Sequence, residues 1–120
     1  MAVSPNGKWL YANQTFFPAQ ISRIEIADPS NVQVYVKLDQ ADVAAGLDGM
    51  TRDGRGDLYV AANGGNWVGR VDTDRSICTL ATGTGMTSAV ALGHSGRGFS
   101  WRNLYAVNFD GELIELPRVR

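Results

Sequence analysis

Apolar and polar residues alternate along short stretches of this chain, as they do in β-strands that bury one face. Residues 32–38 are the clearest case, because Val32, Val34 and Val36 alternate with polar or aromatic neighbours. A two-residue period of this kind predicts a strand. No stretch of ten residues has clean helical periodicity, and 14 glycines and turn pairs such as Asp53-Gly54 interrupt the apolar runs. The pattern therefore predicts an all-β fold.

A motif returns three times at nearly constant spacing: a glycine-rich turn, then Leu-Tyr, then an apolar strand that ends in asparagine. The repeat tyrosines, Tyr11, Tyr59 and Tyr105, are 48 and then 46 residues apart. A β-propeller blade of four short antiparallel strands needs about forty to fifty residues. The repeat therefore predicts about three four-stranded antiparallel blades, the third of which lacks its outer strand. We expect one partial β-propeller over residues 1–120, with blades at approximately residues 1–38, 47–82 and 87–120.

The composition argues against several classes of function. The net charge is −1 and the 11 basic residues are scattered, so we expect no binding to nucleic acid. No apolar run reaches the length of a membrane span, and the first residues lack the pattern of a signal peptide. We therefore expect no membrane association and a cytoplasmic protein. The single cysteine, Cys78, excludes an internal disulfide, and we expect it to be buried in a strand.

Asp48 is the residue that first suggests chemistry. In a propeller the first strand of each blade lines the central channel. We superpose Asp48-Gly49-Met50 on Thr87-Ser88-Ala89, which makes Asp48 and Thr87 equivalent positions at the mouth of the channel. A carboxylate there is a candidate ligand for a hard cation or a general base. It is equally a candidate cap for the turn that enters the strand, and the repeat alone does not decide between these roles.

The second repeat resembles the gluconolactonase and senescence-marker-protein family, through Asp48-Gly49-Met50 and the following Leu58-Tyr59-Val60-Ala61. The resemblance implies a six-bladed propeller, of which this chain is similar to the C-terminal half. It also implies a divalent cation in the channel, Ca²⁺ first with Zn²⁺ or Mg²⁺ as alternatives, and hydrolysis of a small-molecule lactone or ester. The matching segments are residues 47–61, 63–65, 68–72, 87–93 and 103–107.

The resemblance places the family's metal-binding aspartate at Asp48. The cation would polarise the lactone carbonyl, and Asp48 would help to activate water as a catalytic residue. A glutamate and an asparagine that are ligands in the family have no counterpart here, so we expect weak metal binding and poor catalysis by the chain alone. Thr87, Asn63 and Trp67 are candidate substrate-binding residues near the channel mouth, although packing between blades is the more common role of aromatic side chains.

Three kinds of function stay open: a metal-dependent lactonase-like or esterase-like hydrolase that is incomplete or inactive alone, a non-catalytic propeller module that binds a ligand or protein, and a unit that self-assembles into a closed ring. Three blades leave two outer faces uncovered, which exceeds the apolar patch that soluble monomers tolerate. We therefore expect a homodimer, or a partner that completes the propeller. The apolar residues expected on these faces are Val3, Leu10, Ile24, Ile26, Leu104, Val107, Leu113 and Ile114.

Overall fold

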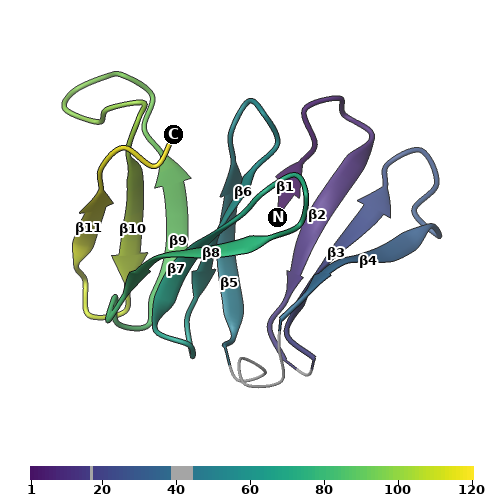
Figure 1. The fold of residues 1–120 in the computed structure, drawn as a ribbon, viewed down its shortest axis with the longest axis horizontal. Coiled ribbons are helices and arrows are strands. Elements are labelled where there is room, and N and C mark those ends of the chain that lie inside the picture. Colours follow the sequence, from purple (N-terminus) through teal and green to yellow (C-terminus); the bar gives the residue numbers. More distant parts are fainter. Residues whose placement is uncertain (17, 39–44) are drawn as a thin grey trace.

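The computed structural model describes residues 1–16, 18–38 and 45–120, which form three antiparallel sheets (Figure 1). Blade 1 consists of β1 (Ala2–Val3), β2 (Trp9–Gln14), β3 (Gln20–Glu25) and β4 (Val32–Lys37). Blade 2 consists of β5 (Leu47–Arg52), β6 (Leu58–Ala62), β7 (Trp67–Val71) and β8 (Ile77–Thr82). Blade 3 consists of β9 (Thr87–Leu92), β10 (Leu104–Asn108) and β11 (Leu113–Leu116).

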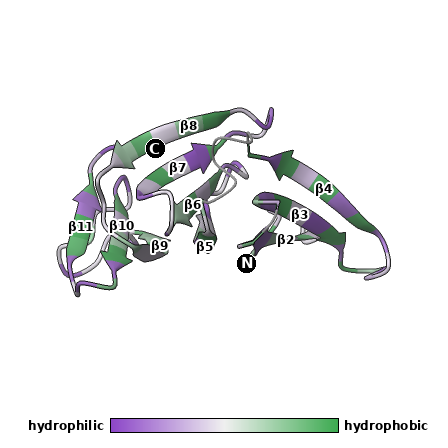
Figure 2. Ribbon diagram, turned by 90° about the horizontal axis from the view of Figure 1, so that it is seen from below, coloured by the Kyte–Doolittle hydropathy of each residue, from purple (hydrophilic) through white to green (hydrophobic). Residues whose placement is uncertain are grey.

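Within each blade the strands are hydrogen-bonded in the order in which they occur along the chain. Each sheet is therefore a simple up-and-down meander, which short turns are sufficient to connect. Figure 2 shows the blades side by side as a fan, with β5 and β9 on its inner side and β4 and β8 on its outer side. The first strand of a blade is thus the innermost one, as the sequence predicts for a channel-lining strand.

The Leu-Tyr pair of the repeat explains how neighbouring blades pack. Successive residues of a strand point to opposite faces of its sheet. In β6, Leu58 is buried in the core between blades 1 and 2, whereas Tyr59 is buried in the core between blades 2 and 3. The whole of β6 is buried, because both faces of blade 2 are covered. The Leu of one blade thus packs on the preceding blade, and the Tyr packs on the following one.

Two expectations about burial are wrong. Val32 and Val34 are 58% and 46% exposed, because they lie on the face of blade 1 that points away from blade 2. Val36 is buried against blade 2, because a register shift in the pairing of β3 with β4 moves it to the opposite face. Cys78 is exposed, since it lies in β8, the outermost strand of blade 2. A sequence pattern marks a strand but does not tell which of its faces a neighbouring blade covers.

Among the residues that the structure describes, there is no helix long and apolar enough to cross a membrane.

Candidate functional site

The inner strands β5 and β9 each contain a β-bulge near their first residues. Leu47 pairs with Ala62 and Met50 pairs with Val60, so Asp48 and the residue after it lie opposite a single residue of β6. The pairing of β9 with β10 shifts in the same way around one extra residue, Ser88. Bulges change the direction in which a side chain points and are frequent next to active sites. Here the bulge leaves the Asp48 side chain exposed, whereas Leu47 is fully buried.

The register corrects the predicted superposition of the repeats. The repeat tyrosines of β6 and β10 pair with Thr51 and Ala91 on the inner strands. Three residues earlier on each inner strand, Asp48 corresponds to Ser88 and not to Thr87. The predicted equivalence is therefore wrong by one residue. A slip of one residue moves a strand side chain to the opposite face of the sheet.

The Thr87 side chain is hydrogen-bonded inside the protein. Its side chain is fully buried, and its hydroxyl oxygen lies 3.0 Å from the backbone oxygen of Thr84 and 2.9 Å from the Thr84 hydroxyl. These hydrogen bonds close the turn that leads into β9. Contact between Thr87 and a substrate stays a prediction, and its burial does not support it.

Asn13 near the end of β2 and Thr15 just after it hold the bulge of β5 in place. The Asn13 side-chain amide donates a hydrogen bond of 2.6 Å to the backbone oxygen of Asp48. The Thr15 hydroxyl donates one of 2.9 Å to the backbone oxygen of Leu47. The side-chain oxygen of Asn13 is buried and has no hydrogen-bond partner among the residues that the structure describes. Sequence reasoning missed Asn13 and Thr15 as site residues, and the only signal for Asn13 was its place at the end of the repeat.

Asn63 directly follows β6, and Trp67 is the first residue of β7. Both therefore lie at the same end of blade 2. The backbone N–H of Asn63 donates to the oxygen of Gly46 at 2.9 Å, while its side-chain nitrogen is buried and finds no partner within residues 1–16, 18–38 and 45–120. The Trp67 ring packs against two glycines, because a Cβ added at Gly65 or Gly69 would lie 2.6 Å from a ring atom. Trp67 also packs on the core between blades 1 and 2. The structure thus shows packing for Trp67, and substrate contact by either residue stays a prediction.

The backbones of β5 and β9 approach each other closely behind Asp48. A Cβ added at Gly49 would lie 2.6 Å from both the Cα of Ala89 and the backbone oxygen of Ser88. No side chain larger than hydrogen fits between these strands. The contact sets Asp48 and Ser88 on adjacent inner strands at the same edge of the fan.

The described residues do not fit a complete cation site. Ca²⁺ binds six to eight oxygen ligands, including several carboxylates. Within residues 1–16, 18–38 and 45–120, no three His, Cys, Asp or Glu side chains gather in a group that could hold a metal ion. Asp48 provides one exposed carboxylate, and the unpartnered oxygen of Asn13 is one further oxygen atom nearby.

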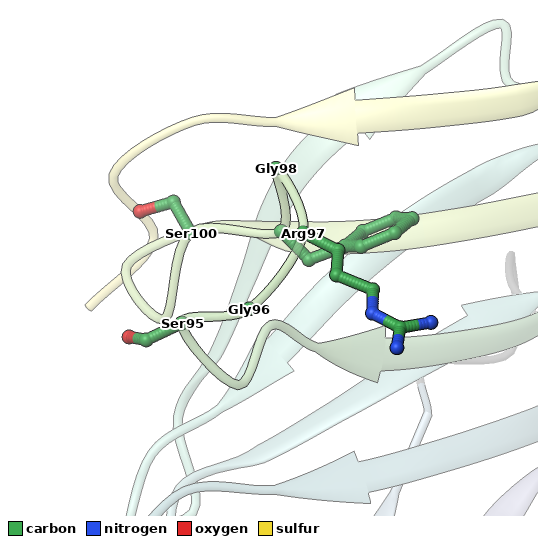
Figure 3. A pocket seen from close by; sticks show the side chains of 6 residues that line it. Ser95, Gly96, Arg97, Gly98 and Ser100 are labelled. Atoms are coloured by element: carbon green, nitrogen blue, oxygen red, sulfur yellow. The ribbon is translucent and has the colours of Figure 1, made fainter.

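The loop between β9 and β10 forms a small pocket but no second site. A bridge between Gly96 and Phe99 curls the loop on itself. Figure 3 shows that the hydroxyls of Ser95 and Ser100 point away from the Arg97 guanidinium. These polar groups do not converge on one point, as a binding site would require.

No protein-family model matches the chain, and no curated protein matches it. Solved structures do match. The calcium-binding protein regucalcin from Agrobacterium tumefaciens has a TM-score of 0.75 and 20% identity, over 99% of this chain and 46% of its own. A gluconolactonase from Xanthomonas campestris has a TM-score of 0.70 and 20% identity, over 97% and 36%. Virginiamycin B lyase from Staphylococcus aureus has a TM-score of 0.59 and 18% identity, over 99% and 40%.

These neighbours are β-propellers. The chain consists of β-propeller blades. The predicted fold class is therefore confirmed, with sheets of four, four and three strands. Because the identities are 18–20%, the likeness establishes the fold and not the activity. The chain spans less than half of the length of each of these three structures.

Proposed function

We propose that this chain forms part of the site of a hydrolase-type propeller that acts on a small-molecule lactone or ester, with Asp48 as the central carboxylate. The observation that carries the proposal is the exposed Asp48 side chain on a bulged inner strand. Hydrogen bonds from Asn13 and Thr15 to the backbone around Asp48 fix the position of this strand. The structural likeness to a gluconolactonase supports a lactone as substrate.

In this proposal the Asp48 carboxylate accepts a hydrogen bond from the attacking water and takes up its proton, as a general base does. Ser88, at the corresponding position of β9, lies where its hydroxyl would bind a polar group of the substrate. A divalent cation, Ca²⁺ before Zn²⁺ or Mg²⁺, belongs to the proposal only for a completed ring. Asp48 would be the carboxylate that this chain contributes to it.

Completion of the ring depends on two end faces that no blade of this chain covers. Residues that pair across neighbouring strands share a face. The Leu10 face of blade 1 therefore consists of the apolar Val3, Leu10, Ala12, Ile24, Val32 and Val34, together with Ser22. The Tyr105 face of blade 3 consists of the apolar or aromatic Ala89, Ala91, Tyr105, Val107 and Leu113, together with the charged Glu115. The expectation that Leu104 and Ile114 lie on an uncovered face is wrong, because both pack against blade 2.

The two end faces would pack on each other as neighbouring blades do inside the chain. Inside the chain, the Tyr59 side of blade 2 packs on the Leu104 side of blade 3. By the same rule the Tyr105 face fits a Leu10 face, and a hollow of about 420 Å³ beside Tyr105 and Phe99 gives room for its side chains. We therefore propose that a second copy of the chain, or a partner that presents such blades, completes the propeller.

A non-catalytic module that binds a ligand or protein on the same ring is the second candidate. It is favoured by one observation, namely that the described residues gather no group of three metal-ligating side chains. The two candidates share the fold and the end faces, and they differ only in turnover.

Turnover of a simple aldonolactone and an aryl ester by the purified chain tests the proposal. We expect hydrolysis that requires Ca²⁺ and is lost in excess chelator. The hydrolytic activity should elute from a sizing column with the assembled species. Asp48→Asn should reduce the rate about a hundredfold, since it removes the base. The control, Asp28→Asn, changes an exposed turn residue and should keep the rate. Turnover that survives the chelator, or that survives Asp48→Asn, would rule out the proposed mechanism, and binding without turnover would favour the non-catalytic module.

A further inference from the structure

A pocket of about 380 Å³ lies between blades 1 and 2, far from Asp48. The turns that join β1 to β2, β5 to β6 and β7 to β8 form its rim. Asp48 is at the beginning of β5 and Arg55 follows its end, so the strand length of about 17 Å separates the two places. Figure 1 shows the turns from β1 to β2 and from β5 to β6 at the upper edge of the fan, whereas β2 runs down toward the opposite edge. The side chains of interest are Trp9, Tyr11, Tyr35, Arg23, Arg55 and Arg75.

One wall of the pocket is aromatic. The rings of Tyr11 and Tyr35 lie 4.9 Å apart at 56°, and each residue is 8% exposed. Burial raises the pKa of Tyr35 above its ordinary value, and the neighbouring Tyr11 raises this pKa further. The Tyr35 phenol thus stays neutral, and it interacts with the Tyr11 side chain.

The other walls carry three arginines from separate elements. The Arg23 guanidinium lies 4.3 Å from the centre of the Trp9 ring and donates to the neutral side-chain oxygen of Gln33. The Arg75 guanidinium lies 5.3 Å from the centre of the Tyr35 ring. Arg55 lies 3.5 Å from the Asp53 carboxylate and 3.8 Å from the Asp57 carboxylate.

The charges around the pocket are therefore only partly balanced. Among the described residues, Arg55 has carboxylate partners, whereas Arg23 and Arg75 form no ion pair. The Glu25 carboxylate, which shares a face of β3 with Arg23, pairs with Lys8 at 3.4 Å. Two guanidinium groups thus keep hydrogen-bond donors that no anion of this part of the chain uses.

The backbone of Arg75 adds an independent observation. Arg75 has a φ of 74°, in the left-handed region that glycine or asparagine adopts at the lowest cost. Strained conformations of this kind persist where the surrounding structure holds them, and they are concentrated at functional sites. In this turn the strain places the Arg75 guanidinium over Tyr35 at the rim of the pocket.

We propose that this pocket binds a small organic anion. Arg23 and Arg75 bind its carboxylate or phosphate group, because the planar guanidinium fork matches the oxygen atoms of these anions. The apolar or aromatic body of the ligand packs against Trp9, Tyr11 and Tyr35. The cavity volume falls within the usual range for small-molecule sites. This site is separate from Asp48 and does not depend on the proposed hydrolysis.

Calorimetric titration of the full chain with phenyl phosphate, benzoate and inorganic phosphate tests the proposal. We expect one saturable site per chain for phenyl phosphate or benzoate, and the tighter of the two identifies the anionic group. Inorganic phosphate should bind at least about tenfold more weakly than phenyl phosphate, because it lacks the aromatic body. Equal binding of inorganic phosphate and phenyl phosphate, or no saturable binding of any probe, would overturn the proposal.

Arg75→Gly separates a binding role from a structural one. It should weaken phenyl phosphate binding about tenfold or more, since a charge-assisted contact is lost. Its melting temperature should not fall, because glycine relieves the left-handed strain. Arg118→Gly is the matched control: Arg118 is also left-handed, at 56°, and lies after β11 in blade 3, away from the pocket. Equal affinity of the two variants, or a loss of folded structure in Arg75→Gly that accounts for its weaker binding, would contradict the proposal.

Discussion

At the scale of single residues, one buried carboxylate organises the turn that follows the inner strand of blade 2. Asp53 is 3% exposed, and one of its oxygens accepts backbone N–H bonds from Arg55, Gly56 and Asp57 at 2.9, 3.0 and 3.1 Å. Its other oxygen lies 3.5 Å from the Arg55 guanidinium. Asp53 therefore shapes the turn and also sets Arg55 at the rim of the anion pocket.

Asp53→Ala should lower the free energy of unfolding by about 1–3 kcal/mol, because it removes the side-chain acceptor of the partly buried backbone N–H groups of Arg55 and Asp57. Urea denaturation followed by circular dichroism measures this change. Asp28→Ala is the control, since the Asp28 carboxylate accepts bonds from the backbone N–H and the hydroxyl of Ser30, at 3.2 and 2.6 Å, in an exposed turn. We expect the control to change stability by less than about 0.5 kcal/mol. Equal losses in the two variants would show that the buried carboxylate is not the cause.

The site residues show how far sequence reasoning reaches at this scale. Asp48 was predicted at the channel side of an inner strand, and the structure places it exposed at the beginning of β5. The predicted counterpart of Asp48 is one residue away from Ser88. Both inner strands carry the same bulge, but the loop from β9 to β10 is longer than the loop from β5 to β6, and no pattern in this single sequence fixes the register across it. Asn13 contacts Asp48, which is 35 residues away in the sequence, and a local sequence pattern does not reveal such a contact.

At the scale of secondary structure elements, the contact between β5 and β9 fixes the site. The strands and their order followed from the repeat, since alternation and turn residues are local signals. The close approach at Gly49 did not follow from the repeat, because it depends on how two blades meet. This glycine has no positive φ to require it, so its role is to leave space for the backbone of Ser88 and Ala89.

Gly49→Ala should destabilise the chain by about 1–3 kcal/mol and shift Asp48 relative to Ser88, because the added methyl group overlaps backbone atoms that cannot rotate away. Thermal unfolding and the chemical shifts of the Asp48 and Ser88 amides report the two effects. Gly54→Ala is the matched control, since nothing lies within 4 Å of a Cβ at that position. The control should be neutral or slightly stabilising. A neutral Gly49→Ala would show that the inner strands have room to separate.

At the scale of the whole molecule, the two end faces are the surfaces that the proposed assembly would cover. The middle blade shows what a covered blade is like: its second strand is buried along its whole length. Blades 1 and 3 bury one face in the same way and expose the other, which includes Val3, Val34, Val107 and Leu113 at 40–60% exposure. The repeat was sufficient to predict two uncovered apolar faces. The residues that line them required the register, because neighbouring positions of a strand point to opposite faces.

A second copy that closes the ring head to tail is the occupant that we propose for these faces, with the Tyr105 face of one copy packed on the Leu10 face of the other. Sedimentation should therefore show a dimer. Val107→Lys should shift it to a monomer, because Val107 is 40% exposed in one chain but buried once a Leu10 face covers it. Ile77→Lys is the control: Ile77 is also 40% exposed, but it lies on the outer strand of blade 2, so the dimer should persist. A folded monomer that stays monomeric at all concentrations would contradict closure by a second copy.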